Sequence, residues 1–124
     1  MIHRPPIHLH SRVALHEYYA LTDRTRAILI FASTYCADEW GYAVTWTSLY
    51  REGDSGVHGF NRGADMSKFV ITRDGKRICM PKKHISQLED VVNKVFPYGK
   101  GRYKTAIYHK VVGGAYHFHF QSKI

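Results

Sequence analysis

Two histidines near the C-terminal end, His117 and His119, are the residues whose type and spacing first indicate chemistry. The segment Tyr116–Phe120 alternates with the period of a strand, which places both imidazoles on one face and both phenyl rings on the other. Imidazole is the commonest metal ligand in proteins, so such a pair is half of a metal site. Two histidines on the solvent face of an edge strand would give the same pattern, and this alternative stays open.

A glycine-rich segment upstream supplies further ligand types. His58 lies within the predicted loop 52–61, and Asp65 follows seven residues later, at the start of a predicted strand. Two neutral imidazoles and one carboxylate suit Zn²⁺ and leave a fourth position for water, as catalytic zinc sites require. Taken singly, His58 can also be an ordinary loop residue and Asp65 a turn or cap residue.

Three segments then follow one another in a specific order. Ser48–Arg51 (SLYR) ends a predicted strand, Ser55–Asp65 (SGVHGFNRGAD) comes next, and His117–His119 (HFH) closes the series. In order and spacing they resemble the zinc D-Ala-D-Ala metallopeptidase family, which includes wall-cutting carboxypeptidases, dipeptidases and phage endolysins and shares its fold with the hedgehog signalling domain. The loop departs from the family pattern at Ser55, Asn61 and Gly63, while the ligand spacing is intact.

The resemblance implies a role for each matching position. His58, Asp65 and His119 would bind zinc, and His117 would be the base or electrostatic partner close to the metal. Zinc activates water and polarises a carbonyl, and a neighbouring imidazole can carry the proton to the leaving amine. Arg51 would face the substrate, where its guanidinium can pair with a terminal carboxylate or stabilise an oxyanion.

Three residues are candidate substrate contacts. Tyr50 is the aromatic side chain expected near the substrate, and Ser55 belongs to the loop motif. His109, on a neighbouring predicted strand, either lines the same cleft or is a partly exposed strand residue. For Arg51 the alternative is a surface ion pair with Glu52 or Asp54.

The elements that must position these residues follow from periodicity and turn signals. Apolar residues at helical spacing predict a helix over 21–40, capped by Thr22 or Asp23 and stopped by Gly41. Asp74-Gly75 predicts a hairpin turn. A second helix follows Pro81 and ends before Pro97. The predicted strands are 42–48, 64–72, 76–80, 105–112 and 115–121, the last two joined by Gly113-Gly114.

These elements predict one α+β domain over residues 1–124, with residues 1–12 as an extended N-terminal arm. We expect a small antiparallel sheet with two main helices packed on it. The resemblance adds a fold of the hedgehog and D-Ala-D-Ala peptidase type. We expect Cys36 and Cys79 to be reduced, buried thiols, with a single bridge between them as the alternative.

Composition limits the partners. The 124 residues carry 18 Lys and Arg against 10 Asp and Glu, a net charge of +8, which favours anionic partners such as wall polymers, acidic lipid surfaces or nucleic acid. No apolar run is long enough to span a bilayer, so no membrane insertion is expected. No recognisable nucleic-acid-binding motif is present, which disfavours nucleic acid as the partner.

These observations predict a monomeric zinc-dependent peptidase that acts on bacterial peptidoglycan, as a D-Ala-D-Ala carboxypeptidase or an endolysin-like endopeptidase. The sequence has no secretory signal, so we expect synthesis in the cytoplasm and phage-type release to the wall. The alternatives are a catalytically inactive binding protein of the same fold, holding an anionic wall polymer, and a basic nucleic-acid-binding module.

Overall fold

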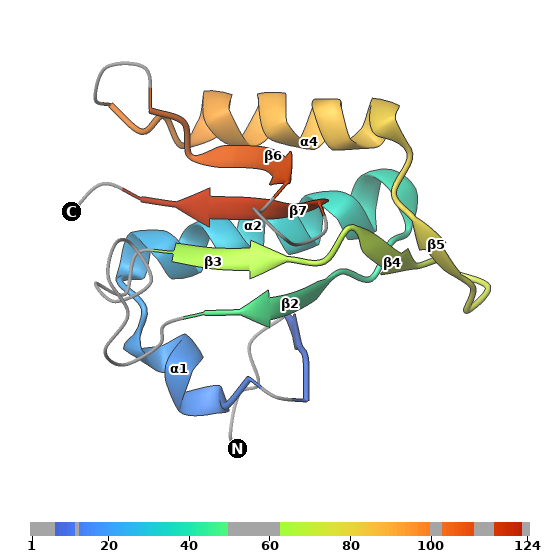
Figure 1. Ribbon diagram of the computed structural model, residues 1–124, viewed down its shortest axis with the longest axis horizontal. Coiled ribbons are helices and arrows are strands. Elements are labelled where there is room, and N and C mark those ends of the chain that lie inside the picture. Colours follow the sequence, from blue (N-terminus) through green and yellow to red (C-terminus); the bar gives the residue numbers. More distant parts are fainter. Residues whose placement is uncertain (1–6, 12, 50–62, 100–102, 111–115, 123–124) are drawn as a thin grey trace.

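The computed structural model describes residues 7–11, 13–49, 63–99, 103–110 and 116–122. In these residues a five-stranded sheet has the order β1-β2-β3-β7-β6, and a separate two-stranded sheet consists of β4 and β5 (Figure 1). The strands are β1 (His8–Leu9), β2 (Thr45–Ser48), β3 (Gly63–Met66), β4 (Phe69–Ile71), β5 (Arg77–Cys79), β6 (Ala106–Lys110) and β7 (Tyr116–Gln121). The helices are α1 (Leu15–Ala20), α2 (Asp23–Trp40) and α4 (Lys82–Val95).

Helix α2 begins and ends where the sequence predicts. The Thr22 hydroxyl accepts a hydrogen bond from the backbone N–H of Thr25 at 3.2 Å, which satisfies one of the free amides of the first turn. Gly41 ends the helix in the left-handed conformation, with φ of 69°, and its N–H donates to the carbonyl of Ala37. Helix α2 therefore has a defined length against the sheet.

Helix α4 confirms the second predicted helix and lies beside the edge strand β6 (Figure 1). Its apolar face buries Ile85, Leu88 and Val92, whereas Val95, predicted on the same face, is 49% exposed. The Asn93 amide donates to the carbonyl of Ala106 at 3.0 Å and accepts from its N–H at 2.9 Å. The Asn93 side chain of α4 thus occupies the backbone N–H and C=O groups of β6 to which an additional strand would otherwise hydrogen-bond.

The core lies between α2 and the sheet. Trp46, Phe118 and Phe120 are fully buried, and the Trp46 and Phe120 ring centroids lie 5.1 Å apart in an edge-to-face contact. The Trp46 indole N–H donates to the Ser33 hydroxyl of α2 at 2.9 Å, so its one polar group is satisfied. The opposite face of β7 carries the polar side chains of His117, His119 and Gln121.

The sheet differs from the expected antiparallel one. Strand β1, taken from the predicted N-terminal arm, pairs in parallel with β2, with His8 opposite Thr45 and Leu9 opposite Trp46. The sheet is therefore mixed. The fold belongs to the predicted α+β class but does not have the purely antiparallel sheet that was expected. Two paired residues are too few to show a strand period in the sequence.

The predicted strand 64–72 is divided into β3 and β4. Between them, the N–H of Ser67 donates to the carbonyl of Thr45, and the Ser67 hydroxyl accepts from the N–H of Phe69 at 3.1 Å. This local hydrogen bond turns the chain out of the main sheet. The hairpin expected at Asp74-Gly75 is confirmed by the pairing of β4 with β5 and by a φ of 85° at Gly75.

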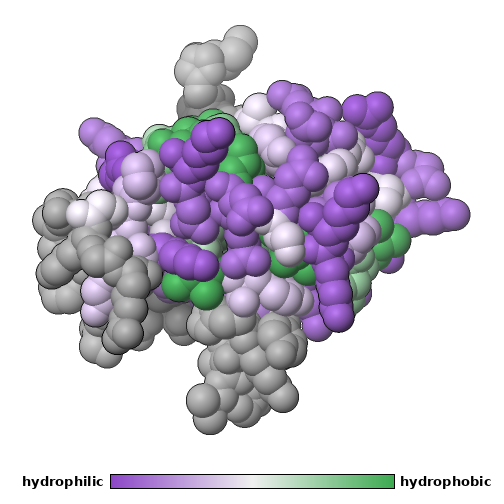
Figure 2. Space-filling model, turned by 90° about the horizontal axis from the view of Figure 1, so that it is seen from above, coloured by the Kyte–Doolittle hydropathy of each residue, from purple (hydrophilic) through white to green (hydrophobic). Residues whose placement is uncertain are grey.

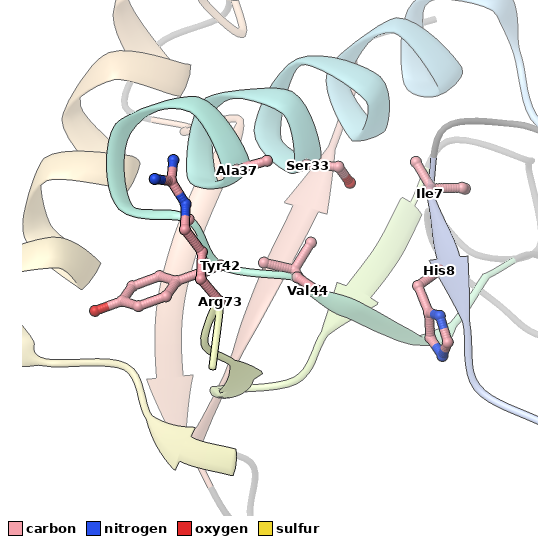
Figure 3. A pocket seen from close by; sticks show the side chains of 9 residues that line it. Ile7, His8, Ser33, Ala37, Tyr42, Val44 and Arg73 are labelled. Carbon is pink, nitrogen blue, oxygen red and sulfur yellow. The ribbon is translucent and has the colours of Figure 1, made fainter. Parts of the chain in front are cut away.

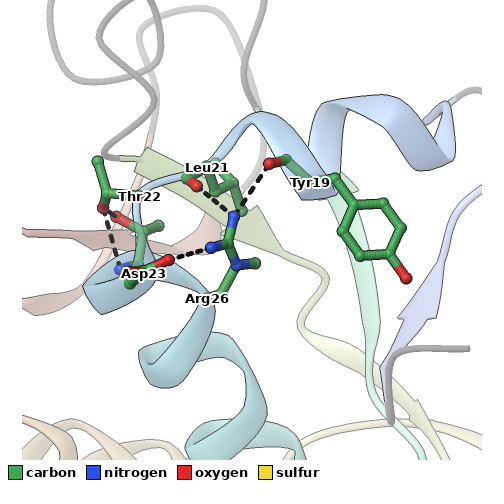
Figure 4. Close-up of polar contacts among 6 residues, drawn as sticks. Tyr19, Leu21, Thr22, Asp23 and Arg26 are labelled. Atoms are coloured by element: carbon green, nitrogen blue, oxygen red, sulfur yellow. Dashed lines mark hydrogen bonds and ion pairs between the residues drawn. The ribbon is translucent and has the colours of Figure 1, made fainter. Parts of the chain in front are cut away.

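Helix α1 is held against the start of α2 by Arg26 (Figure 4). The Arg26 guanidinium donates to the carbonyl of Tyr19 at 3.0 Å and to that of Leu21, and it pairs with Asp23. Carbonyl groups at a helix C-terminus need such partners because no helical N–H reaches them. Arg26 therefore joins the end of α1 to the first turn of α2.

The cysteine prediction is confirmed in part. Both cysteines are free thiols, and Cys36 is buried, but Cys79 is exposed on β5, contrary to expectation. Burial raises the pKa of the Cys36 thiol to about 12. Cys79 belongs to a two-stranded hairpin, which has too few neighbours to enclose it.

The face above α4 is strongly polar. Viewed from above Figure 1, hydrophilic side chains predominate and apolar patches are small (Figure 2). Helix α4 carries three exposed lysines, Lys82, Lys83 and Lys94. None of the helices in the described part of the chain has the length and apolar character needed to cross a bilayer.

Candidate functional site

The two C-terminal histidines lie where the strand period predicts. Phe118 and Phe120 are fully buried, while the His117 and His119 side chains are 23% and 16% exposed on the other face of β7. The reason is geometric, since successive side chains of a strand point to opposite faces and the core takes the phenyl rings. The imidazoles are therefore sheltered but reachable.

Asp65 joins the two histidines through strand pairing. Strand β3 runs antiparallel to β7 with Asp65 directly opposite His119, although the two residues are 54 positions apart. The Asp65 Oδ1 atom lies 3.0 Å from His119 Nδ1 and 3.5 Å from His117 Nε2. Three predicted site residues thus meet around one carboxylate oxygen, and the side chain of Asp65 is only 16% exposed.

These distances can be compared with what a zinc ion requires. Nitrogen and oxygen ligands bond Zn²⁺ at about 2.0–2.1 Å, so two ligand atoms of a tetrahedral site lie about 3.3 Å apart. The separation of Asp65 Oδ1 from His119 Nδ1 falls near this value, and it also suits a hydrogen bond. The separation is therefore compatible with a shared zinc ion and equally with a direct hydrogen bond between Asp65 and His119.

A third protein ligand is still needed. Within the described residues, no group of three or more His, Cys, Asp or Glu side chains is arranged to hold a metal ion. The third predicted ligand, His58, lies outside those residues, as do Tyr50, Arg51 and Ser55. For His109, the structure places the backbone opposite His117 in the pairing of β6 with β7.

A cavity of about 380 Å³ opens beside the carboxylate and the first histidine. It is lined by Asp65 and His117 together with Val13, Glu17, Thr47, Ser48 and Leu49. The Ser48 hydroxyl oxygen is buried and has no hydrogen-bond partner among the described residues. A buried hydroxyl without a partner costs free energy, which marks it as a group that a ligand can satisfy.

Sequence reasoning missed Glu17, Thr47 and Ser48 as cavity residues. Thr47 directly precedes the SLYR motif, and Ser48 is its first residue. Their position beside this motif is the signal by which the sequence could have identified them. Glu17 comes from α1, and its Oε2 accepts a hydrogen bond from the N–H of Ala14 at 2.6 Å. Arg26 joins α1 to α2 through the carbonyls of Tyr19 and Leu21, and no pattern in the sequence of α1 predicts that Glu17 lies beside β2.

Gln121 is a further side chain on the same face. It follows His119 by two residues on β7, and its Oε1 lies 3.3 Å from His119 Nε2. Its Nε2 donates to the carbonyl of Lys104 at 2.8 Å. The second nitrogen of His119 is therefore also engaged.

A larger cavity, of about 460 Å³, lies at the end of α2 (Figure 3). Its walls include Ile7, His8, Ser33, Tyr42, Val44 and Arg73. Its lining holds no carboxylate or thiol and only one imidazole, so the described residues there do not form a metal site. Size alone does not make it the better candidate, and the chemistry favours the cavity beside Asp65.

Comparisons of the chain with protein-family models, with curated proteins and with solved structures find no match in any of the three.

Proposed function

We propose that this protein is a zinc-dependent peptidase that hydrolyses peptide bonds of bacterial peptidoglycan, as a D-Ala-D-Ala carboxypeptidase or an endolysin-like endopeptidase. The observation that carries the proposal is the meeting of Asp65, His117 and His119 on one sheet face beside a cavity. These are the described members of the residue set that the resemblance implies. The strand pairing that joins them is independent of that resemblance.

The proposed division of labour follows from where each atom lies. Asp65 Oδ1 and His119 Nδ1 would hold the zinc ion, and His58 would be its third protein ligand. When bound, zinc supplies a Lewis acid that activates water and polarises the scissile carbonyl. His117 Nε2, 3.5 Å from Asp65 Oδ1, accepts the proton of the attacking water and returns it to the leaving amine.

The reaction balances with water as the only co-reactant. The C–O bond to the acyl carbon forms, the C–N bond of the peptide breaks, and the water's proton passes through His117 to the amine nitrogen. The cavity beside His117 has space for part of the peptide, and the buried Ser48 hydroxyl offers a hydrogen bond to one of its polar groups. In this scheme Arg51 pairs with a carboxylate of the substrate.

The first experiment compares zinc content and peptide-bond hydrolysis in wild type and single variants. We expect about one zinc per chain in wild type, and loss of zinc and activity together in Asp65→Ala and His119→Ala. His117→Ala should retain zinc while its turnover falls about 10²–10⁴-fold, because it removes the proton acceptor and not a ligand. His16→Ala, an exposed histidine on α1, is the matched control and should behave as wild type.

The products distinguish the two activities. A carboxypeptidase releases free D-Ala from peptides that end in D-Ala-D-Ala, whereas an endopeptidase releases new amino groups from cross-linked wall without free D-Ala. Hydrolysis that persists at the wild-type rate in His119→Ala would overturn the proposal. So would a wild-type protein that neither binds zinc nor cuts either substrate.

A second candidate function has one observation in its favour. Helix α4 exposes Lys82, Lys83 and Lys94, and the chain as a whole carries a net charge of +8. Exposed lysines can hold an anionic wall polymer without any catalysis, although α4 also carries Glu89 and the exposed Asp90. Wall binding that is abolished by moderate salt and unchanged in Asp65→Ala, with no hydrolysis by wild type, would favour this binding protein.

A further inference from the structure

The cavity of about 460 Å³ at the end of α2 combines apolar walls with polar side chains of one kind (Figure 3). Its volume is within the range of about 300–1,000 Å³ that is typical of small-molecule sites. Ala37 comes from α2, Val44 precedes β2 and Ile7 precedes β1, and these three supply apolar surface. The polar side chains of the lining are His8, Ser33, Tyr42 and Arg73, with no carboxylate among them. A ligand there needs an apolar body and a group that accepts hydrogen bonds.

Arg73 is the permanently charged side chain of this lining. It lies across Gly41, the residue that ends α2 with a φ of 69°. A Cβ atom at Gly41 would lie 2.7 Å from Arg73 Cγ, closer than real Cβ atoms come to such a neighbour. Position 41 therefore requires glycine for two reasons, the left-handed backbone and the space that Arg73 occupies.

The guanidinium of Arg73 is available to a ligand. In the residues that the structure describes, no ion pair or hydrogen bond engages it. Two carboxylates, Glu39 and Asp74, line a separate hollow together with Arg73 but do not line this cavity. Asp74 already accepts from the Thr72 hydroxyl and pairs with Lys76 Nζ at 3.8 Å. A ligand anion in the cavity therefore meets the guanidinium without an acidic side chain in the same lining.

Ser33 adds a buried donor to the cavity. The residue is 8% exposed, and its oxygen accepts the hydrogen bond of the Trp46 indole N–H at 2.9 Å. The hydroxyl hydrogen is not used in that contact, because an indole N–H can only donate. The Tyr42 hydroxyl, by contrast, lies 2.9 Å from Nδ1 of His84, which is not part of the lining. Ser33 and Arg73 can thus hold an anion, while Tyr42 contributes its ring to the wall.

Charge complementarity identifies the class of ligand. One guanidinium neutralises one negative charge, and its planar fork matches the two oxygens of a carboxylate. A phosphate monoester carries up to two charges, which a single arginine would not compensate. We propose that this cavity binds a small monocarboxylate with an apolar body, whose carboxylate pairs with Arg73 and whose body lies against the apolar wall. The cavity shares no lining residue with the one beside Asp65, so the inference does not rest on the proposed function.

The test uses the full chain and octanoate as the probe, with Kd measured by isothermal titration calorimetry. Acetate has the carboxylate without the apolar body, and octylammonium has the apolar body with the opposite charge. We expect octanoate to bind at least about tenfold more tightly than either, because only octanoate satisfies both parts of the cavity.

Two pairs of variants locate the binding. Arg73→Gln removes the charge and should raise the octanoate Kd by about 10–100-fold. Arg77→Gln makes the same change on the same hairpin outside the lining and should leave the Kd unchanged. Ala37→Leu places a larger side chain in the cavity and should abolish binding, whereas Thr34→Leu, at another exposed position of α2, should not. Both substitutions on α2 are at exposed positions, so neither disturbs the core.

Three results would overturn the inference. The first is wild type that binds octanoate no more tightly than acetate or octylammonium, and the second is an unchanged octanoate Kd in Arg73→Gln and Ala37→Leu. The third is loss of octanoate binding in Asp65→Ala, which would assign the carboxylate to the proposed zinc ion. If octanoate binds as expected but wild type takes up no zinc, the inference stands and the zinc peptidase fails.

Discussion

Asp65 and His119 meet although they lie 54 positions apart, and only the pairing of β3 with β7 brings them together. At the scale of single residues, the candidate site is therefore a product of strand register. A shift of one residue in this pairing would turn Asp65 or the histidines to the opposite face of the sheet. The buried phenyl rings of Phe118 and Phe120 prevent that shift, because they would have to exchange places with imidazoles.

At Ser48, the stability of the folded protein and the binding of a ligand place opposite demands on one side chain. Its hydroxyl oxygen is buried without a partner among the described residues, and it lines the cavity beside Asp65. Ser48→Ala removes the buried hydroxyl, so we expect the free energy of unfolding to rise by about 1 kcal/mol in urea denaturation. Binding of a peptide ligand in the cavity should weaken in the same variant.

The control is Thr47→Val at the neighbouring position, where the hydroxyl donates to the carbonyl of Asp65 at 3.4 Å. This variant loses a hydrogen bond and should not gain stability. A Ser48→Ala variant less stable than wild type would mean that the hydroxyl is satisfied in the folded protein.

The sequence contains a signal for Gln121 but none for Glu17. The period that pairs His117 with His119 continues to residue 121, so the shared face extends to Gln121 by the same rule. Glu17 reaches the cavity from α1, whose end is joined to α2 by Arg26. Such a tertiary contact has no period and no motif in the sequence.

At the scale of elements, the long helices and the β4–β5 hairpin were predictable, whereas α1 and β1 were not. Thr22, Gly41 and Pro81 are local signals for helix boundaries, and each stands at the boundary that it predicts. Helix α1 has six residues and β1 has two, so neither shows enough of a repeat to be recognised. The parallel pairing of β1 with β2 could not be predicted because the two strands are joined by a crossover that contains α1 and α2, and not by a hairpin turn.

The contact between α4 and β6 depends on one amide. Asn93 makes two hydrogen bonds to the backbone of Ala106, and Asn93→Leu would leave both backbone groups without these partners. We expect the free energy of unfolding to fall by about 2 kcal/mol, as measured by urea denaturation. Ser86→Leu, at an exposed position of the same helix, should change it by about 0.5 kcal/mol or less. Equal effects of the two substitutions would contradict a specific role for Asn93.

At the scale of the whole molecule, burial of ionisable groups makes stability depend on alkaline pH. The Cys36 thiol has its pKa raised from 9.0 to about 12, and burial also raises the pKa values of Tyr18 and Tyr42. Above pH 9.0 the unfolded chain releases the thiol proton while the folded protein keeps it. The free energy of unfolding is therefore at its full value below pH 9.0 and falls as the pH rises toward 12.

The thiol's share of this effect can be isolated with Cys36→Ala. Between about pH 8 and about pH 10.5, we expect wild type to lose about 1–2 kcal/mol more stability than Cys36→Ala, measured by urea denaturation at both pH values. The substitution also lowers stability at every pH by leaving a small void, so the comparison rests on the change with pH. Identical pH dependence in both proteins would show that the Cys36 thiol ionises as readily in the folded state.

The Asn93 contact has a consequence for how copies of the chain behave together. Strand β6 is the last strand of the sheet, and α4 engages its outer backbone through Asn93 and through Glu89, which accepts from the N–H of Tyr108 at 3.2 Å. If α4 moves away, the amides and carbonyls of β6 become a template for the same strand of another copy. Helix α4 thus protects the protein against self-templated aggregation, and a chain weakened at this contact would lose solubility before it lost its fold.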